Sequence, residues 1–345
     1  FIINSLELEK AKEFTTTSLA LSAHKKGHTV YYLEIGDLTY YPDGQMGSVA
    51  YVLRPEEKFK DEEALMKKLK SDKVEKETIK AGFLDVLSLR YNPEDSRDDR
   101  KWIKQGGLVF GQIAMTRGVL VLSHPYTLSY AINKMYFQHF PEEVRPKTII
   151  SRRKDEILKF YEENNKHIIL KPLEGSGGSN VYNIDDTNNL NQIIETLAKD
   201  GYIIGQEYLP AASKGDVRFF LMNGKPLIRD GKYAAVQRVN PKDDFRANIS
   251  VGATIKKAKV TKEMLKLAEI VGPKIRNDGL FLVGLDIVGD KLIEINVISS
   301  GALQFCSDME GVNFCDSVIE SIERKLELKK FYNGTLTNKQ LAVMD

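Results

Sequence analysis

Residues 169–178 combine a cation with a glycine-rich turn, the two features that bind phosphate groups. The segment reads Ile-Leu-Lys-Pro-Leu-Glu-Gly-Ser-Gly-Gly, so Lys171 stands at the end of an apolar run and the glycines follow it. A charge in that place is costly without an anionic partner. Successive backbone N–H groups in a glycine turn can hold phosphate oxygens. We therefore expect a phosphate site, with a flexible hairpin loop as the alternative for the turn taken alone.

The turn fits neither of the two common nucleotide fingerprints. No lysine followed by serine or threonine comes after the glycines, as a P-loop requires, and Asn180 stands at the last glycine position of the dinucleotide pattern. The turn also joins two expected strands instead of a strand and a helix. The phosphate site is therefore predicted from its chemistry and not from a known loop.

A second segment, residues 284–297, offers three oxygen ligands. Glu294 and Asn296 are two apart in an apolar strand, so both project from one face; Asp286 lies in the preceding strand, before a turn at residues 289–290. A two-residue loop leaves Asp286 on the opposite face from Glu294, whereas an odd-length loop pairs them directly. Facing carboxylates repel unless a cation joins them, and carboxylate and amide oxygens suit magnesium. We expect a magnesium site, with an acidic surface hairpin as the alternative.

Three basic residues are further candidates. Lys134 opens an apolar stretch, Arg218 follows Asp216 in a strand, and Arg246 lies in a polar loop between strands. Each residue taken alone is more often on the surface or ion-paired.

The composition excludes several classes of protein. The 345 residues carry 50 basic and 48 acidic side chains, a net charge of +2, which gives no general field for nucleic acid or an anionic membrane. Two cysteines argue for a reducing compartment and against a disulfide scaffold or a structural zinc site. Residues 1–7 lack the pattern of a secretory signal, and no apolar run is long enough to span a bilayer. We expect a cytoplasmic protein.

The order of elements predicts an α/β protein of several domains. Residues 1–123 alternate strands and helices, with strands at 29–33, 85–90 and 118–122. Residues 124–202 hold strands at 148–150, 167–172 and 181–184 with helices at 154–164 and 190–199. Residues 203–332 are rich in strands, with a hairpin at Asn223-Gly224 and helices at 262–276 and 313–329. We expect residues 333–345 to form a loose tail.

Several motifs, in one collinear order from residue 1 to about 325, resemble the ATP-grasp superfamily and in particular bacterial-type glutathione synthetases. The segment from Lys171 is similar to the family's Lys-Pro-Leu-Asp-Gly-Met-Gly-Gly. Residues 284–297 are similar to Gly-Leu-Asp-Ile-Ile-Gly-Asp followed by Glu-Ile-Asn-Val. Shorter matches lie at 36–38, 140–148, 208–210 and 215–218.

The resemblance implies an ATP-grasp fold, with an N-terminal α/β (pre-ATP-grasp) domain, a small lid domain and a C-terminal antiparallel-sheet domain. It implies an ATP-dependent carboxylate–amine ligase that acts through an acyl phosphate on an amino acid or short peptide, such as γ-glutamylcysteine with glycine. The glycine turn acts as a lid that keeps water from the acyl phosphate. A homo-oligomer is what the family suggests.

The resemblance also assigns roles to residues. The metal, Mg²⁺ or alternatively Mn²⁺, is held by Asp286, Glu294 and Asn296. The residues that contact ATP are Lys134, Lys171, Gly175, Ser176, Gly177, Gly178, Gln206, Glu207, Tyr208 and Leu209. The catalytic residues are Lys171, Arg218 and Arg246, of which Arg246 stabilises the oxyanion of the tetrahedral intermediate. The substrate-binding residues are Arg90, Asn248, Ser299, Ser300 and Gly301.

Departures from the family concentrate where acceptor substrates are expected. The family's Arg-Lys-Asp-Pro-Pro reads Arg-Tyr-Asn-Pro-Glu at residues 90–94, and its Thr-Ser-Pro-Thr reads Ile-Ser-Ser-Gly at 298–301. Changed polar groups in a buried pocket alter specificity by large factors. Two alternatives to glutathione synthesis therefore stay open: a divergent ATP-grasp ligase making another peptide-like product, and an ATP-binding module without ligase activity.

Overall fold

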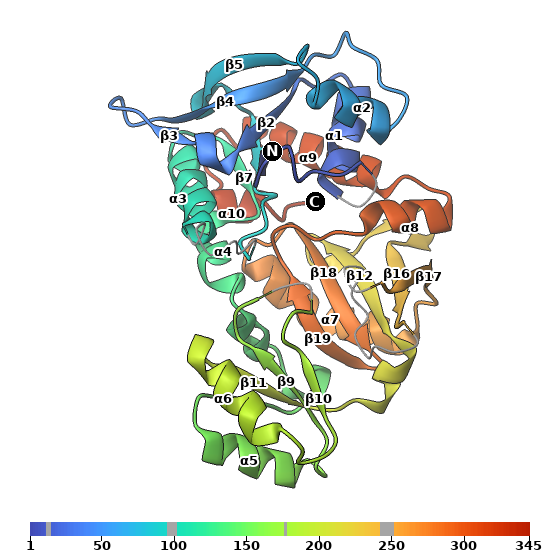
Figure 1. The fold of residues 1–345 in the computed structure, drawn as a ribbon. Coiled ribbons are helices and arrows are strands. Elements are labelled where there is room, and N and C mark those ends of the chain that lie inside the picture. The colour runs from blue at the N-terminus through green and yellow to red at the C-terminus, as the bar shows by residue number, and fades with distance from the viewer. Residues whose placement is uncertain (12–14, 95–101, 176–177, 242–251) are drawn as a thin grey trace.

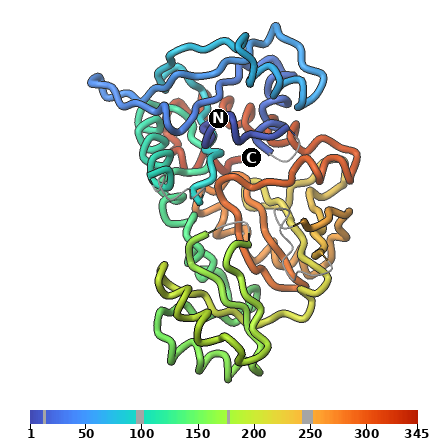
Figure 2. The backbone as a smooth tube through the Cα atoms, in the orientation of Figure 1, coloured from blue at the N-terminus to red at the C-terminus, as the bar shows by residue number. Residues whose placement is uncertain are grey.

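The computed structural model describes residues 1–11, 15–94, 102–175, 178–241 and 252–345 (Figure 1). Within them, three sheets of four or more strands lie one after another along the long direction of the molecule. The sheet from the first third of the chain is at one end, the sheet from its middle third is at the other, and the C-terminal sheet lies between them. Figure 2 follows the same path, with the C-terminal segment in red returning to the blue N-terminal half.

The first sheet has the order β1-β2-β4-β3, with β5 paired to β4, and β6 and β7 form a separate parallel pair. The strands of this sheet are β1 (Ile2–Ile3), β2 (Val30–Glu34), β3 (Thr39–Tyr40), β4 (Met46–Leu53) and β5 (Glu75–Lys80), and those of the separate pair are β6 (Val86–Ser88) and β7 (Leu120–Leu122). Its helices are α1 (Thr15–Lys25), α2 (Glu62–Leu69), α3 (Ile103–Thr116) and α4 (Pro125–Ala131). The strands expected at 29–33, 85–90 and 118–122 are confirmed as β2, β6 and β7.

The middle sheet, with the order β10-β9-β11-β8, is antiparallel throughout. Its elements are β8 (Thr148–Ser151), α5 (Lys154–Glu163), β9 (Ile168–Pro172), β10 (Tyr182–Ile184), α6 (Leu190–Asp200) and β11 (Ile203–Glu207). Apolar residues of α5 and α6, such as Ile157 and Ile194, pack with Ile168 and Leu170 of β9 in a core of their own. The sheet therefore holds the end of β9, and with it Lys171, in a fixed position.

The C-terminal sheet has the order β17-β16-β12-β18-β19, with β13 paired to β12. Its strands are β12 (Asp216–Met222), β13 (Lys225–Pro226), β16 (Ala235–Val239), β17 (Thr254–Lys257), β18 (Leu282–Val288) and β19 (Lys291–Asn296), and β14 (Ile228–Arg229) pairs with β15 (Lys232–Tyr233) beside them. The helices are α7 (Lys262–Asn277), α8 (Leu303–Glu310), α9 (Phe314–Phe331) and α10 (Asn338–Leu341). Short 3-10 turns are η1 (Ile35–Asp37), η2 (Ala81–Phe83), η3 (Lys134–His139), η4 (Glu142–Val144) and η5 (Pro210–Lys214). The hairpin expected at Asn223-Gly224 is confirmed between β12 and β13.

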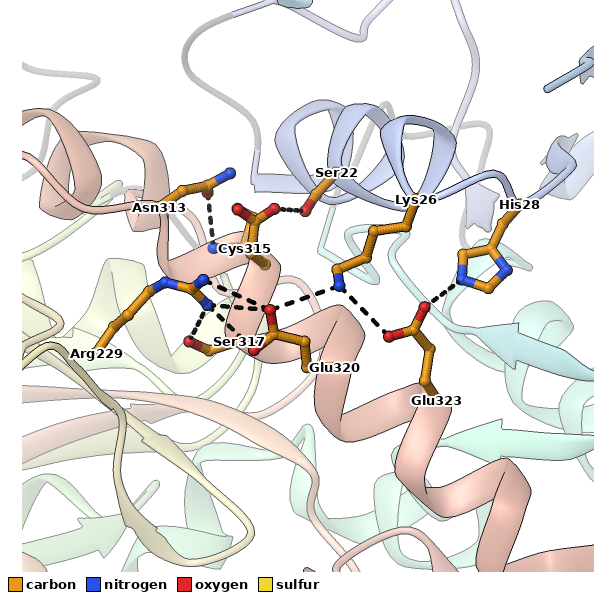
Figure 3. Close-up of polar contacts among 10 residues, drawn as sticks. Ser22, Lys26, His28, Arg229, Asn313, Cys315, Ser317, Glu320 and Glu323 are labelled. Carbon is orange, nitrogen blue, oxygen red and sulfur yellow. Dashed lines mark hydrogen bonds and ion pairs between the residues drawn. The ribbon is translucent and has the colours of Figure 1, made fainter. Parts of the chain in front are cut away.

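Helix α9 from the end of the chain packs against α1 from its beginning (Figure 3). Lys26 lies 3.5 Å from both Glu320 and Glu323, and His28 Nε2 lies 2.8 Å from Glu323 Oε1. Arg229 of β14 reaches Glu320 from the other side at 3.1 Å. Partly exposed ion pairs of this kind add little stability one by one, but together they fix how the two helices meet. These ion pairs help to hold the first sheet and its helices, together the first unit, over one end of the C-terminal sheet.

The prediction of a loose tail over residues 333–345 is wrong. The segment contains α10, Ala342 is fully buried, and the buried Lys325 Nζ donates to the carbonyl of Met344 at 2.5 Å. The sequence pattern missed this because a single helical turn and a few apolar residues give no clear periodicity.

Cys306 and Cys315 are both buried and unbonded. Among the described residues, no helix is long and apolar enough to cross a membrane.

Candidate active site

Two cavities meet where the three sheets come together. The larger, about 360 Å³, is bounded by the first unit and the C-terminal sheet, and the smaller, about 150 Å³, by the middle and C-terminal sheets. The residues common to both linings are Lys134, Lys171, Gly175, Gln206, Ile293 and Glu294. The predicted phosphate and metal segments thus lie together at the junction of two pockets.

Strand β19 contains a bulge that decides the direction of its acidic side chain. The turn is the two-residue loop Gly289-Asp290, so Val288 pairs with Lys291 and Ile287 with Leu292. The register then shifts by one residue, which leaves Ile293 unpaired and sets Glu294 directly opposite Asp286. Directly opposed residues share a face of the sheet, so the bulge puts both carboxylates on one side. Of the two arrangements that the sequence left open, the facing one is present.

Asp286 lies in a buried network with two arginines and a second aspartate. Arg218 contacts its two oxygens at 2.5 and 3.0 Å, and Arg238 contacts Oδ2 at 2.8 Å. Arg238 also bonds both oxygens of Asp216 at 2.6 Å. Burial by itself raises the pKa of Asp286, but the two guanidinium groups outweigh it and hold that pKa at about 2. Burial and the charge of Asp286 raise the pKa of Asp216 to about 6.

Sequence reasoning missed Arg238 as part of the site. It stands in a strand beside buried alanine and valine, and a charge in such a run signals a buried ionic partner. Arg218, predicted to be catalytic, lies behind Asp286 and also donates to the carbonyl of Gly301 at 3.1 Å. In this arrangement it orients Asp286.

The two predicted phosphate lysines both reach the junction of the cavities. Lys171 Nζ, at the end of β9, donates to Gln206 Oε1 at 3.4 Å, and Lys134 Nζ donates to the carbonyl of Pro172 at 3.3 Å. Burial lowers the pKa of Lys171 to about 8 and also lowers the pKa of Lys134, while the nearby charge of Glu294 acts in the opposite direction on both. Two partly buried cations with long bonds to neutral oxygens leave room for an anion.

The wall of the smaller cavity holds Gln206, Glu207, Tyr208 and Leu209, which are predicted to contact ATP. Glu207, Tyr208 and Leu209 line it at the end of β11. Glu207 Oε1 accepts the backbone N–H of Lys147 at 2.7 Å, and the ring of His167 stacks on that of Tyr208 with centroids 3.8 Å apart and planes at 8°. These contacts fix the wall in place.

Of the residues predicted to bind the acceptor substrate, Arg90, Ser299 and Gly301 lie at the larger cavity, and hydrogen bonds within the chain occupy polar atoms of Arg90, Ser299 and the neighbouring Ser300. The buried guanidinium group of Arg90 donates to the carbonyl of Ser300 at 3.0 Å, and the backbone carbonyl of Arg90 accepts from the hydroxyl of Ser299 at 2.9 Å. The buried Ser300 hydroxyl donates to the carbonyl of Asn296 at 2.6 Å. Arg90, Ser299 and Gly301 line the cavity. Arg90 therefore shapes this wall by holding the backbone of residues 298–300, and Ser300 by bonding to Asn296.

Four predicted site residues, Ser176, Gly177, Arg246 and Asn248, lie outside the described residues. A contact that sequence reasoning missed joins the first unit to the glycine turn: the N–H of Gly175 donates to Glu94 Oε2 at 2.8 Å. The signal was present in the sequence, because Glu94 replaces a proline of the family motif.

The donor set suits a hard divalent cation. Glu294 lines both cavities and has no hydrogen-bond or ion-pair partner within the described ranges; Asn296 donates its amide N–H to Asp286 Oδ2 at 3.3 Å, which leaves its own oxygen for a ligand. No group of three or more His, Cys, Asp or Glu in the described part of the chain is placed to hold a metal. The fit therefore rests on two carboxylates and one amide, with Asp286 shared between metal and arginines.

The arrangement of the three sheets is that of the ATP-grasp fold. Among solved structures, the ATP-grasp ligase PsnB complexed with a minimal precursor has a TM-score of 0.57 at 16% identity over 94% of this chain and 97% of that chain. The D-cycloserine synthetase DcsG has a TM-score of 0.53 at 12% identity over 74% and 87%. At these identities the likeness concerns the fold alone.

Sequence comparison gives the family. The profile of the prokaryotic glutathione synthetase ATP-grasp domain matches residues 133–311, and that of the prokaryotic glutathione synthetase N-terminal domain matches residues 1–128. The glutathione synthetase of Pseudomonas syringae pv. tomato is 31% identical over 95% of this chain and 98% of its own length, and that of Escherichia coli is 28% identical over 94% and 96%. The chain belongs to the prokaryotic glutathione synthetase family. It is a glutathione synthetase-like, ATP-dependent ligase that forms carbon–nitrogen bonds.

Proposed function

We propose that the protein joins the free carboxylate of the cysteine in γ-glutamylcysteine to the amine of glycine, with ATP converted to ADP and phosphate. The observation that carries this proposal is the meeting of the two cavities at Lys134, Lys171 and Glu294. A carboxylate from the larger cavity can there approach the terminal phosphate of a nucleotide from the smaller one. Such juxtaposition converts an encounter of separate molecules into a reaction within one complex.

The smaller cavity holds ATP in this proposal. Tyr208 and Leu209 face the adenine together with Glu207, while Lys134 and Lys171 offset the charge of the phosphates. The turn at Gly175 and Gly178 closes over them and keeps water from the acyl phosphate.

Mg²⁺ is the proposed metal, with Mn²⁺ as a chemical alternative, held by Asp286, Glu294 and Asn296. When bound, it neutralises negative charge on the transferring phosphoryl group. Arg218 and Arg238 orient Asp286 for this role. Arg246 is proposed to stabilise the oxyanion that forms when the amine attacks the acyl phosphate.

The limits of the three domains, at residues 123 and 202, stay a prediction. So do a homo-oligomeric state, a cytoplasmic location, and the absence of nucleic-acid and membrane partners.

The proposal is tested by incubating purified protein with magnesium-ATP, γ-glutamylcysteine and glycine, omitting each in turn. ADP release and glutathione, identified by mass, are expected only in the complete mixture. ADP release without glutathione in that mixture would contradict the proposed substrates.

A second candidate is ligation of a different amine or peptide. It is favoured by one observation: the wall of the larger cavity contains Asn92, Glu94 and Gly301, at positions where the chain departs from the family motifs. Replacing glycine by other amino acids in the same assay tests it, and this candidate requires faster ADP release with one of them than with glycine.

A further inference from the structure

The glycine turn already binds an anion supplied by the chain itself. The N–H of Gly175 points at Oε2 of Glu94, 2.8 Å away, although the two residues are 81 positions apart in sequence. Gly175 lines both cavities and Glu94 lines the larger one. A backbone donor at the junction of the two pockets is thus paired with a carboxylate of the same chain.

The Glu94 carboxylate is held in this position from a second side. Lys104 of α3 lies 3.5 Å from Glu94 Oε1 and 2.7 Å from Glu174 Oε1. The Glu94 side chain is 19% exposed, whereas that of Glu174 is 66% exposed. A shielded ion pair is screened less by water than an exposed one. Glu94 therefore has a defined place, and Glu174 lies beside the same lysine in open solvent.

A nucleotide phosphate competes with Glu94 for the same surroundings. The negative charges of Glu94 and Glu174 both act to raise the pKa of Lys134. All three side chains therefore lie close to the position proposed for the phosphates. One N–H cannot donate fully to a carboxylate and to a phosphate oxygen at once, and the two anions repel in a partly buried site.

We propose that Glu94 is a built-in competitor of the nucleotide: its carboxylate occupies the phosphate position at the Gly175 N–H and leaves when the nucleotide arrives. The inference rests on the proposed function only in placing the triphosphate at this junction. Because Glu94 also forms part of the wall of the larger cavity, its departure changes that cavity as the nucleotide enters. Nucleotide binding thereby prepares the acceptor pocket.

The test is calorimetric titration of the full chain with magnesium and AMPPNP, an ATP analogue that is not hydrolysed. Glu94→Ala frees the N–H and removes the repelling charge, so its Kd is expected to fall about tenfold, the factor that corresponds to one charge-assisted hydrogen bond. Glu94→Gln keeps an acceptor oxygen without the charge. Its Kd for AMPPNP is expected to lie between the values of wild type and Glu94→Ala.

Glu174→Gln is the matched control, because it removes one negative charge beside the same lysine and binds no N–H of the turn. Its Kd is expected to stay within about twofold of wild type, as for other exposed ion pairs. An unchanged or higher Kd for Glu94→Ala would overturn the proposal, and so would equal tightening by Glu174→Gln. Glutathione formation is not part of this titration. A failure to form glutathione in the separate activity assay would overturn the proposed substrates but would leave the competition between Glu94 and nucleotide standing.

Discussion

Asp286 lies directly opposite Glu294 because β19 carries one residue more than β18 between the turn and that pair. Without the bulge, the two-residue turn would pair Asp286 with Ile293 and direct Glu294 to the opposite face of the sheet. Asp286 is neutralised by Arg218 and Arg238, whereas the described residues give Glu294 no direct partner. The pair is therefore asymmetric: one carboxylate is fixed in the protein and the other faces the two cavities.

Glu294→Gln tests whether that open carboxylate holds the metal. The amide keeps the shape but loses the charge, so kcat/KM is expected to fall at least about 100-fold, since even residues that only support a ligand cost 10–100-fold. The measurement is ADP release at increasing magnesium concentration, where the variant is also expected to need more metal.

Asp290→Asn is the control for this variant, because it removes one charge from the exposed turn of the same hairpin. It is expected to leave the rate and the magnesium dependence unchanged. A Glu294→Gln protein with the magnesium dependence of wild type would remove Glu294 from the metal site.

Arg246→Ala is expected to abolish ligation and to leave binding of AMPPNP nearly intact. The reason is that oxyanion stabilisation acts on the attack of the amine and not on the nucleotide, and the loss of one such donor costs about 100- to 1,000-fold in rate. Arg246→Lys, which keeps the charge, is expected to recover part of the activity. Turnover of Arg246→Ala at the wild-type rate would remove this residue from the catalytic set.

Arg238→Met tests the buried charge network. It leaves Asp216 without its arginine and Asp286 with only Arg218, so unfolding free energy is expected to fall by about 3–5 kcal/mol, the typical cost of breaking a buried pair. Urea unfolding followed by circular dichroism measures it. The control is Arg54→Met, because Arg54 pairs with Glu75 on the surface and its loss is expected to change stability much less. Equal effects of the two substitutions would show that the network is not a principal support of the fold.

Most of the site was predictable from the sequence because its parts are local motifs. The lysine before the glycine turn and the oxygen ligands on one hairpin each depend on residues close together in the chain. The resemblance to the family then brought the two segments together. The facing of Asp286 and Glu294 could not be decided, since a bulge depends on how β19 fits its neighbour and not on residue types alone.

The contacts that sequence reasoning missed join residues far apart in the chain. Glu94 and Gly175 are 81 positions apart in sequence. Arg238 of β16 reaches Asp286 of β18 past the intervening strand β12. Neither pair belongs to one motif, so the pairing depends on the packing of whole sheets. The final segment was missed for the same reason, because Lys325 and Met344 meet only after α9 and α10 have packed.

Lys325 gives a prediction about pH and stability. Burial lowers the pKa of this lysine from its ordinary 10.5 to about 7. Between these two values the unfolded chain binds a proton that the folded protein has released. The unfolding free energy is therefore expected to rise with pH from 7 to 10.5, by at most about 1.4 kcal/mol per pH unit, and Lys325 is expected to add no pH dependence below pH 7, where it is protonated in both states.

Urea unfolding at pH 7, 8 and 9 measures that slope, and the difference between wild type and Lys325→Met isolates the part due to this residue. The exposed Lys225, which pairs with Asp345 nearby, serves as control, and Lys225→Met is expected to keep the wild-type slope. Three acceptors around Lys325 Nζ favour its charged form. They are Asn223 Oδ1 at 2.9 Å, Ser321 Oγ at 3.2 Å and the carbonyl of Met344. If Lys325→Met keeps the wild-type slope, these acceptors outweigh burial and Lys325 stays charged, which would contradict the prediction.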